Sequence, residues 1–223
     1  FTSNDVGCLS IDRQPFSLAT LAKSDLSFIY SVMTTLTLSE LLVYPIKSAS
    51  GISVDSAALT PRGLQDDRRY MVVDSEGHIL TQRRLPKMSL IQVSVVAQDG
   101  GTALWVSAPG MSELHVTLPV IASSLEVEVW GDRTAALSAG PTAKAWFSQY
   151  LSTDCQLVYM PDSAKRPTEH GKFGPDEIVS FADAYPYLLL TEASLAGLNQ
   201  KLIAKQAEPV PMNRFRPNLV IGG

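Results

Sequence analysis

One short stretch, residues 43–51 with the sequence VYPIKSASG, constrains the fold more than any other. An apolar segment leads into it, and Pro45 has no N–H group to donate to a neighbouring strand, so we expect a strand to end there. Lys47 and Ser48 then fall in the following turn, where Gly51 is expected to let the backbone fold so that nearby N–H groups point at one anion. The stretch predicts a small anion-binding turn. From these residues alone, a solvated turn without a ligand is the open alternative.

Composition and charge narrow the class of protein. Hydrophobic residues make up 45% of the chain and charged residues 18%, which is typical of a globular protein and not of a disordered one. The net charge of −4 and the pI of about 5.4 give no overall basic field for nucleic acid or for an anionic membrane. We therefore expect neither partner, and an anion site must be a local pocket.

Cysteines, histidines and apolar runs bear on location and metal binding. Cys8 and Cys155 lie far apart without metal-ligand spacing, so we expect neither a zinc site nor a disulfide scaffold. The histidines (His78, His115 and His170) show no spacing that indicates catalysis. No apolar run reaches the roughly 18–20 residues needed to span a bilayer. The first residues also lack the pattern of a signal peptide. These features predict a cytoplasmic protein.

Alternating apolar residues and turn formers predict a mainly β first half. We expect Gly77 to close a hairpin with a positive φ, and residues 99–101 to form a tight turn. Many short strands joined by glycine turns favour a closed antiparallel barrel. The predicted strands are 36–43, 52–59, 68–74 with its return 79–82, 90–96, 103–107, 114–118 and 125–130.

Two helices are predicted in the second half. Pro141 suits the first position of one helix, which we expect to cover the barrel, and Thr191 suits the N-cap of the other. Between them, residues 162–171 are polar and rich in turn formers, which predicts a mobile loop or a linker. Strands are expected at 156–159 and 187–190, and again from 219 onwards. The apolar face of the first helix comprises Ala143, Trp146, Phe147, Tyr150 and Leu151.

Three separated motifs carry a family resemblance. They are residues 44–48 (YPIKS), 67–70 (DRRY) and 213–218 (NRFRPN). Together, and in this order, they resemble the MOSC-domain molybdenum-cofactor proteins similar to the mitochondrial amidoxime reducing component and its bacterial relatives. The resemblance covers the chain from about residue 35 to its end.

The resemblance implies a domain organisation. Residues 35–160 correspond to an antiparallel MOSC N-terminal β-barrel domain. Residues 161–223 correspond to a linker and the incomplete first part of a MOSC α+β/β-barrel domain. Residues 1–34 form an unmatched extension, to which we assign no function.

The resemblance also implies cofactor-binding residues. Lys47 and Ser48 match the pair that holds the molybdopterin phosphate, and Arg68 and Arg216 match arginines that reach the cofactor. Pro217 is expected to keep the backbone of Arg216 extended. Three cations at one point call for an anion, because their repulsion would otherwise cost stability. From the residues alone, a surface ion pair for Arg68 and an exposed position for Arg216 are the open alternatives.

Weaker candidates complete the predicted site. Asn213 and Asn218 flank Arg216 and are secondary candidates for cofactor contact. Ala184 and Tyr185 match a family loop that contacts the cofactor, and we expect any contact there to involve the backbone. The resemblance assigns no catalytic residue and no metal ligand within this chain.

The resemblance implies an activity for the intact protein. We expect a molybdenum-cofactor oxidoreductase that reduces small N-hydroxylated compounds, such as hydroxylaminopurines and amidoximes, with electrons from a redox partner or an electron-transfer domain. The family's molybdenum-binding cysteine, and a C-terminal 2Fe–2S domain found in some relatives, would lie beyond Gly223. The fragment alone is therefore expected to be inactive.

Two other interpretations stay open. The chain could be a non-catalytic β-barrel binding module that docks a partner or carries a sulfur or metal group. Alternatively, the motifs could stabilise the barrel through ion pairs with Asp66, Asp67 and Asp183. A sequencing read past Gly223 and a phosphate-dependent melting temperature would separate these possibilities.

Several prominent side chains are given structural roles. Trp105, Trp130 and Trp146 are expected to be core residues. Arg69 is expected to face away from Arg68, and Arg83 is expected to orient the hairpin without a chemical role.

Overall fold

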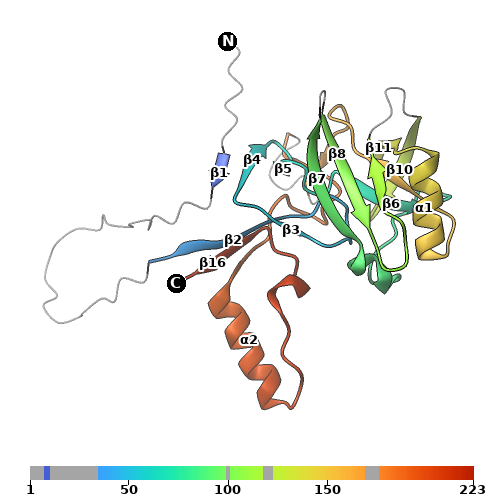
Figure 1. Ribbon diagram of the computed structural model, residues 1–223. Coiled ribbons are helices and arrows are strands. Elements are labelled where there is room, and N and C mark those ends of the chain that lie inside the picture. The colour runs from blue at the N-terminus through green and yellow to red at the C-terminus, as the bar shows by residue number, and fades with distance from the viewer. Residues whose placement is uncertain (1–7, 11–34, 99–100, 118–122, 169–175) are drawn as a thin grey trace, which may run out of the picture.

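The computed structural model describes residues 8–10, 35–98, 101–117, 123–168 and 176–223 (Figure 1). Four predictions fall wholly or partly outside these residues. They concern the extension 1–34 apart from its strand at 8–10, the turn at 99–101, the last residue of the strand 114–118 and the end of the polar segment 162–171.

The described strands form five hydrogen-bonded sheets. One three-stranded sheet has the order β1-β4-β5 and another β7-β8-β9, while a two-stranded sheet pairs β13 with β14. The four-stranded sheets have the orders β10-β11-β12-β6 and β15-β16-β2-β3. The strands are β1 (Cys8–Ser10), β2 (Thr37–Val43), β3 (Ile52–Ser53), β4 (Ser56–Thr60), β5 (Gly63–Leu64), β6 (Tyr70–Asp74), β7 (Gln92–Gln98), β8 (Gly101–Ser107), β9 (Leu114–Val116), β10 (Ser124–Val129), β11 (Asp132–Ser138), β12 (Cys155–Tyr159), β13 (Arg166–Pro167), β14 (Ile178–Val179), β15 (Leu189–Thr191) and β16 (Leu219–Gly222).

The mainly β class is confirmed, but the described strands do not close into one antiparallel sheet. β15 and β16 are parallel to each other. The predicted strand 52–59 is broken into β3 and β4, and the predicted return at 79–82 is reduced to a single bridge between Val73 and Ile79. The sheets stay separate because several strands are short and their ladders are interrupted. The number of predicted strands therefore did not determine whether a barrel closes.

The sheet β15-β16-β2-β3 brings distant motifs together. β2 ends at Val43, directly before Tyr44 and Pro45, as Pro45 predicts. β16 pairs antiparallel with β2, and the Leu42 N–H donates to the Asn218 carbonyl at 2.8 Å. The Arg68 N–H donates to the Tyr44 carbonyl at 2.7 Å. All three motifs therefore meet at the end of β2.

Helix α1 (Pro141–Leu151) confirms its prediction. Pro141 occupies the first turn, and all five residues predicted for the apolar face are buried. They pack into the main core with residues of η1 (Pro86–Leu90) and the neighbouring strands, such as Met88 and Leu157. This core fixes the body of the molecule beside the site.

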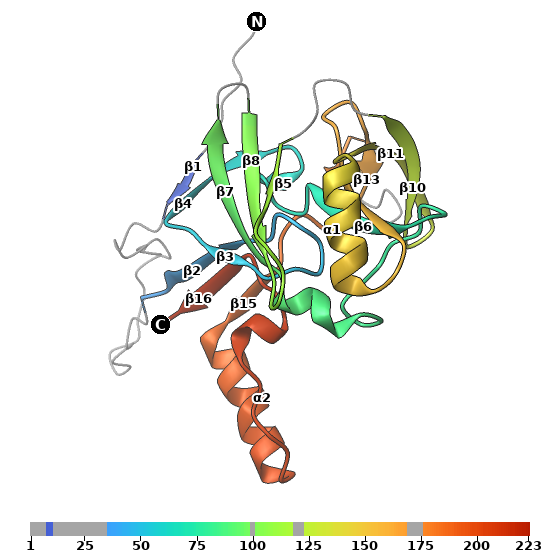
Figure 2. The same ribbon diagram turned by 45° about the vertical axis from the view of Figure 1, so that its right-hand side comes forward.

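Helix α2 (Glu192–Ala204) begins as predicted at Thr191, whose Oγ1 accepts a hydrogen bond from the Ser194 N–H at 3.0 Å. None of its residues is buried, and it projects away from the sheets (Figure 2). The chain then returns through η3 (Met212–Arg214) to β16. No helix within the described ranges combines the length and apolarity needed to cross a bilayer.

The hairpin and tryptophan predictions had mixed outcomes. Gly77 has a φ of 86°, as predicted, and a Cβ there would lie 2.8 Å from the Glu126 carbonyl oxygen.

Among the tryptophans predicted to be core residues, Trp146 is one. The core prediction is wrong for Trp105 and Trp130, which are 41% and 49% exposed. Trp105 stacks on His115, whereas Trp130 belongs to the candidate site.

Candidate functional site

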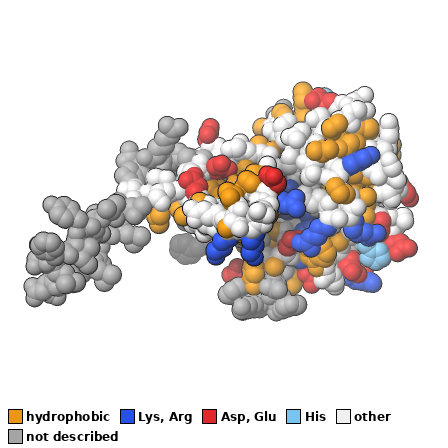
Figure 3. Space-filling model, turned by 90° about the horizontal axis from the view of Figure 1, so that it is seen from below, with side chains coloured by type: hydrophobic (Ala, Val, Ile, Leu, Met, Phe, Trp, Pro, Cys, Tyr) orange, Lys and Arg blue, Asp and Glu red, His pale blue; other side chains and the backbone are white. Residues whose placement is uncertain are grey.

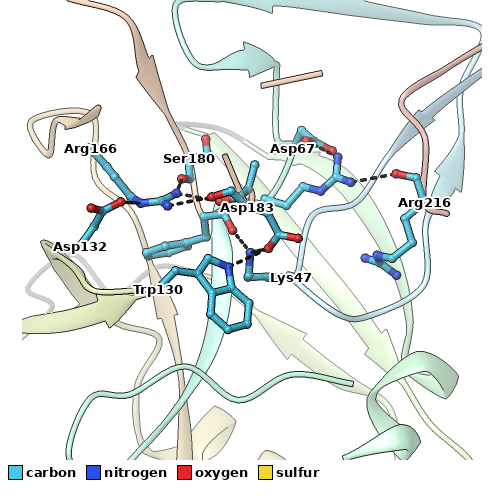
Figure 4. Close-up of polar contacts among 11 residues, drawn as sticks. Lys47, Asp67, Trp130, Asp132, Arg166, Ser180, Asp183 and Arg216 are labelled. Carbon is cyan, nitrogen blue, oxygen red and sulfur yellow. Dashed lines mark hydrogen bonds and ion pairs between the residues drawn. The ribbon is translucent and has the colours of Figure 1, made fainter. Parts of the chain in front are cut away.

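The site contains an ion pair between Lys47 and Asp183. The buried Lys47 ammonium group donates to Asp183 Oδ1 at 2.7 Å and to the Phe181 carbonyl at 2.5 Å. Trp130 Nε1 donates to the same carboxylate oxygen at 2.9 Å. In Figure 4, Lys47 and Asp183 lie at the centre, with Arg166 on one side and Arg216 on the other. The ion pair with Asp183 that one interpretation predicted is therefore present.

Burial affects the two members of this ion pair differently. The side chain of Lys47 is only 7% exposed, and this burial lowers its pKa to about 8 although Asp183 favours the charged ammonium. Burial would raise the pKa of the Asp183 carboxyl. The Lys47 charge and hydrogen bond, with the Trp130 bond, outweigh this effect and bring that pKa to about 2. Asp183 is 64% exposed and loses less hydration, so it stays ionised.

Two arginines that were not predicted as site residues support this ion pair. Arg166 is 3% exposed, pairs with Asp132 at 3.0 Å, and donates through Nη2 to the Asp183 carbonyl at 3.0 Å. It thereby fixes the loop that carries Asp183. Arg83 lies 5.5 Å from the centre of the Trp130 ring. The sequence flagged Arg83 without a role, and Arg166 carried no signal beyond a charge in a polar segment.

Arg68 is held by an extensive hydrogen-bond network. Its Nη1 donates to Asp67 Oδ2 at 2.6 Å and to Asn218 Oδ1 at 2.9 Å, and its Nη2 donates to the Arg216 carbonyl at 3.1 Å. Asp67 is 3% exposed and also accepts from the Tyr44 N–H at 2.8 Å. Burial raises the pKa of the Asp67 carboxyl, while Arg68 and the other donors oppose that rise. The expected pair between Arg68 and Asp67 is thus present, but it is buried.

Asn218 positions other groups. Its Oδ1 accepts from Arg68 and from the Leu188 N–H, and its Nδ2 donates to the Leu42 carbonyl and to Asp67. These four bonds use its full hydrogen-bonding capacity. Asn218 therefore holds Arg68 and Asp67 in place, and it has no spare donor for a ligand.

Arg216 has a donor left over. Its Nη1 donates to the Ala49 carbonyl at 2.5 Å, while its Nη2 is buried and has no hydrogen-bond partner among the described residues. Burial, followed by repulsion from Arg68, lowers the pKa of the Arg216 guanidinium to about 10. A buried charged donor without a partner is costly, and an anion would satisfy it.

The backbone is left-handed at three predicted site residues. Ser48 has a φ of 70°, Arg68 of 49° and Arg216 of 58°. The extended conformation predicted for Arg216 is wrong, because the chain turns there after η3 and the Arg216 N–H donates to the Asn213 carbonyl at 3.2 Å. Left-handed conformations cost non-glycine residues on the order of 1–2 kcal/mol, so surrounding contacts must hold them.

Gly51 acts through close packing. Its φ is not positive, and a Cβ at this position would lie 2.5 Å from Cε1 of the Tyr44 ring. The turn at Lys47 and Ser48 therefore does not depend on a positive φ at Gly51. Gly51 instead lets the ring of Tyr44 lie against the main chain.

The remaining predicted residues occupy different environments. Ser48 is buried, Ala184 is half-buried, and Tyr185 and Asn213 are exposed. Ala184 and Tyr185 directly follow Asp183 in the chain. Their contact with a cofactor stays a prediction. Arg69 is structural as expected, since it pairs with Asp162 at 2.7 Å and lies over the Tyr159 ring.

Cys155 is buried beside Ser148, and burial raises the pKa of its thiol. A raised thiol pKa does not favour the thiolate that a metal requires. Over the described ranges, the structure shows no group of three or more His, Cys, Asp or Glu side chains that could hold a metal ion. The chemistry of the site is that of cations and hydrogen-bond donors.

The charge balance of the site favours an anionic ligand. The three predicted cations Lys47, Arg68 and Arg216 are accompanied by two carboxylates, Asp67 and Asp183, which leaves one positive charge uncompensated. On the face shown in Figure 3, Lys and Arg side chains (blue) alternate with acidic ones (red). The positive character is therefore local, as the acidic pI predicts.

Known proteins are similar to this chain over most of its length. The family model of the MOSC N-terminal beta barrel domain matches residues 35–154, and that of the MOSC domain matches residues 176–223. The chain is 35% identical over 197 residues to mitochondrial amidoxime reducing component 2 of Bos taurus, covering 84% of this chain and 56% of the relative. Mitochondrial amidoxime-reducing component 1 of Xenopus laevis is 32% identical over 197 residues, covering 83% and 55%.

A protein of another name is similar to the same degree. Molybdenum cofactor sulfurase of Oryza sativa subsp. japonica is 32% identical over 200 residues, covering 83% of this chain and 24% of the relative. The chain thus spans about half the length of the amidoxime reducing components that it matches, and about a quarter of the sulfurase.

Proposed function

This chain belongs to the family of MOSC N-terminal beta barrel domain proteins, and on that premise we propose that it binds the molybdenum cofactor through the phosphate of the pterin. The family predicted from the three motifs is confirmed. The ligand and the residues that contact it are the proposal.

The observation that carries the proposal is the unpaired Nη2 of Arg216. This buried donor lies in a site with one uncompensated positive charge, and a phosphate would supply both the acceptor oxygen and the missing negative charge. The residues therefore fit a phosphorylated cofactor.

Each residue has a distinct part in this proposal. Arg216 and Arg68 would bind the phosphate, with Arg68 preorganised by Asp67. Lys47 is bonded to Asp183, so it would contact the phosphate only by sharing or exchanging that partner. Ser48 would add a hydroxyl donor, and backbone groups at Ala184 and Tyr185 would contribute further bonds. When bound, the cofactor supplies the oxygen-transfer chemistry of its molybdenum.

For the intact protein we propose reduction of small N-hydroxylated compounds, such as amidoximes and hydroxylaminopurines. The names of two relatives, both amidoxime reducing components, support amidoxime reduction. Electrons would come from a redox partner or from an iron–sulfur domain. The share of this chain would be to bind and orient the cofactor, which is the usual role of the protein in cofactor chemistry. We expect the chain by itself to be inactive.

A second candidate is a cofactor-binding module without reductase activity. The match to a molybdenum cofactor sulfurase, in which the aligned segment is a quarter of the protein, favours this possibility. Both candidates require the same anion site. If the full-length protein binds the cofactor but does not reduce an amidoxime in the presence of an electron donor, the module is favoured.

Thermal unfolding in inorganic phosphate tests the shared part of the proposal. At constant ionic strength, phosphate at about 100 times its Kd should stabilise the wild-type chain by about 2.7 kcal/mol, because a ligand of the folded state adds RT ln(1 + [L]/Kd). Arg216→Ala should abolish most of this stabilisation. Arg133→Ala serves as the control, because Arg133 forms an exposed pair with Glu126 outside the site. Equal stabilisation of both variants would contradict the proposal.

Two further expectations stay predictions. The cytoplasmic location rests on the sequence alone, and the two amidoxime reducing relatives are named as mitochondrial. The domain boundary at residue 160 lies between the two matched segments.

A further inference from the structure

Tyr44 occupies an unusual position among the site cations. The guanidinium carbons of Arg68 and Arg216 each lie 4.3 Å from the centre of its ring. The side chain is almost fully buried, with 2% exposure, and packs against Gly51. Two arginines thus share one aromatic ring.

The Tyr44 ring offsets the repulsion between the Arg68 and Arg216 guanidinium groups. Burial and the charge of Arg68 lower the pKa of the Arg216 guanidinium, so the two arginines disfavour each other's charge. The negative face of an aromatic ring attracts a guanidinium group, most strongly where water is excluded. One ring in contact with both groups can therefore hold two like charges near one point.

Arg216 depends on the ring more than Arg68 does. The Arg68 guanidinium has three hydrogen bonds, to Asp67, to Asn218 and to the Arg216 carbonyl. Among the residues that the structure describes, the Arg216 guanidinium has one, to the Ala49 carbonyl. The Tyr44 ring is a further contact that fixes the direction of Arg216.

We propose that Tyr44 is a positioning residue whose ring holds the Arg68 and Arg216 guanidinium groups at a single anion site. The inference rests on the proposed function, since it concerns the same phosphate site. The proposal concerns the ring alone. The hydroxyl is buried without a hydrogen-bond partner among the described residues, so its part must be tested separately from that of the ring.

Substitution of Tyr44 tests the ring and the hydroxyl separately. We measure the affinity of the 223-residue chain for inorganic phosphate by calorimetry, at constant ionic strength. Tyr44→Phe keeps the aromatic face and should retain the wild-type affinity within about twofold. Tyr44→Leu removes both cation–π contacts and should weaken phosphate binding about tenfold. A tenfold loss for Tyr44→Phe would instead make the hydroxyl a direct ligand and overturn the positioning role.

Tyr159→Leu is the matched control. Tyr159 also lies under an arginine, with the Arg69 guanidinium carbon 4.8 Å from its ring, and it packs at the edge of the main core. This variant should also lose stability but should bind phosphate with wild-type affinity. If Tyr44→Leu and Tyr159→Leu reduce the affinity equally, a general loss of packing explains the effect and the inference is wrong.

A substitution at Gly51 moves the ring without changing its chemistry. In Gly51→Ala the new methyl group would overlap the Tyr44 ring, so the ring must shift away from its present position. Phosphate affinity should fall severalfold although both arginines and the tyrosine remain.

The wild-type result separates the proposed function from the role of Tyr44. If the wild-type chain fails to bind phosphate, the proposed function fails. If wild type binds and Tyr44→Leu and Gly51→Ala bind equally well, only the role of Tyr44 fails.

Discussion

The two halves of the cation cluster differ in how their charges are compensated. In the lysine half, Lys47 has its own carboxylate, Asp183, which is largely exposed. In the arginine half, Arg68 forms an ion pair with Asp67. Nη2 of Arg216 is buried and has no hydrogen-bond partner among the described residues. On the proposed function, the arginine half binds the ligand. The lysine half already has a counter-ion, so a ligand there must share or displace Asp183.

The strongest test of this contrast is Asp67→Asn. It removes the one buried carboxylate of the arginine half and leaves Arg68 without its ion-pair partner, while Arg216 keeps the favourable charge of Asp183. Breaking a buried pair in this way costs about 3–5 kcal/mol of unfolding free energy. Urea denaturation measures it, with Asp162→Asn as the control. The Asp162 carboxylate is 90% exposed in its pair with Arg69, so its loss should cost less than about 1 kcal/mol. Similar losses in both variants would refute the contrast.

In the lysine half, burial of the charged Lys47 ammonium group should make the free energy of unfolding depend on pH. The pKa of Lys47 is about 8 in the folded chain, below the ordinary value of 10.5, so the unfolded chain holds more protons between these values. The free energy of unfolding should therefore rise by about 2 kcal/mol from pH 8 to pH 10.

Lys47→Met identifies the source of that rise. Its free energy of unfolding should rise by only about 0.4 kcal/mol over the same interval, because Arg216, with a pKa of about 10, is half deprotonated by pH 10. A rise in Lys47→Met as steep as in the wild type would assign the effect to other groups.

Asp183→Asn should raise phosphate affinity while it lowers stability. The variant frees the Lys47 ammonium and removes a negative charge beside the anion site, so phosphate should bind about threefold more tightly. The pair contributes about 1 kcal/mol once its exposure is allowed for. Because the pKa of Asp183 is depressed to about 2, this contribution is present above about pH 4 and disappears as the pH falls through 2. Weaker phosphate binding in the variant would show that Asp183 positions Lys47 for the ligand.

The smallest effect is expected for Trp130→Phe. It removes the bond from Nε1 to Asp183 and should cost about 0.5–1 kcal/mol. NMR titration should show the Asp183 pKa moving up toward its ordinary value. Trp105→Phe is the control, since Trp105 is similarly exposed but stacks on His115. An unchanged Asp183 pKa in Trp130→Phe would exclude the bond from the lysine half.

Local features were predictable where neighbours in sequence decide the conformation. The end of β2 before Pro45, the start of α1 at Pro141 and the N-cap at Thr191 were all predicted correctly. The backbone at Arg216 was predicted incorrectly, because Pro217 limits the preceding residue but does not select the left-handed turn that η3 imposes.

The candidate site was predictable only in part. The motifs identified Lys47, Arg68 and Arg216, and one interpretation named Asp67 and Asp183 as partners. The exposure of Trp130 and the support from Arg166 were missed. Neither residue has a local pattern that separates a site position from a core or surface position.

The sequence by itself determined which residues are cationic, where β2 and α1 lie and which family the motifs resemble. Only the tertiary structure decided which cation has a counter-ion and which does not. Lys47 meets Asp183 across 136 residues, and Arg68 meets Asn218 across 150. Such distant contacts decide which side chains are buried and which hydrogen-bond partners they have. Only the folded chain excludes water from these side chains and brings acceptors to their donors.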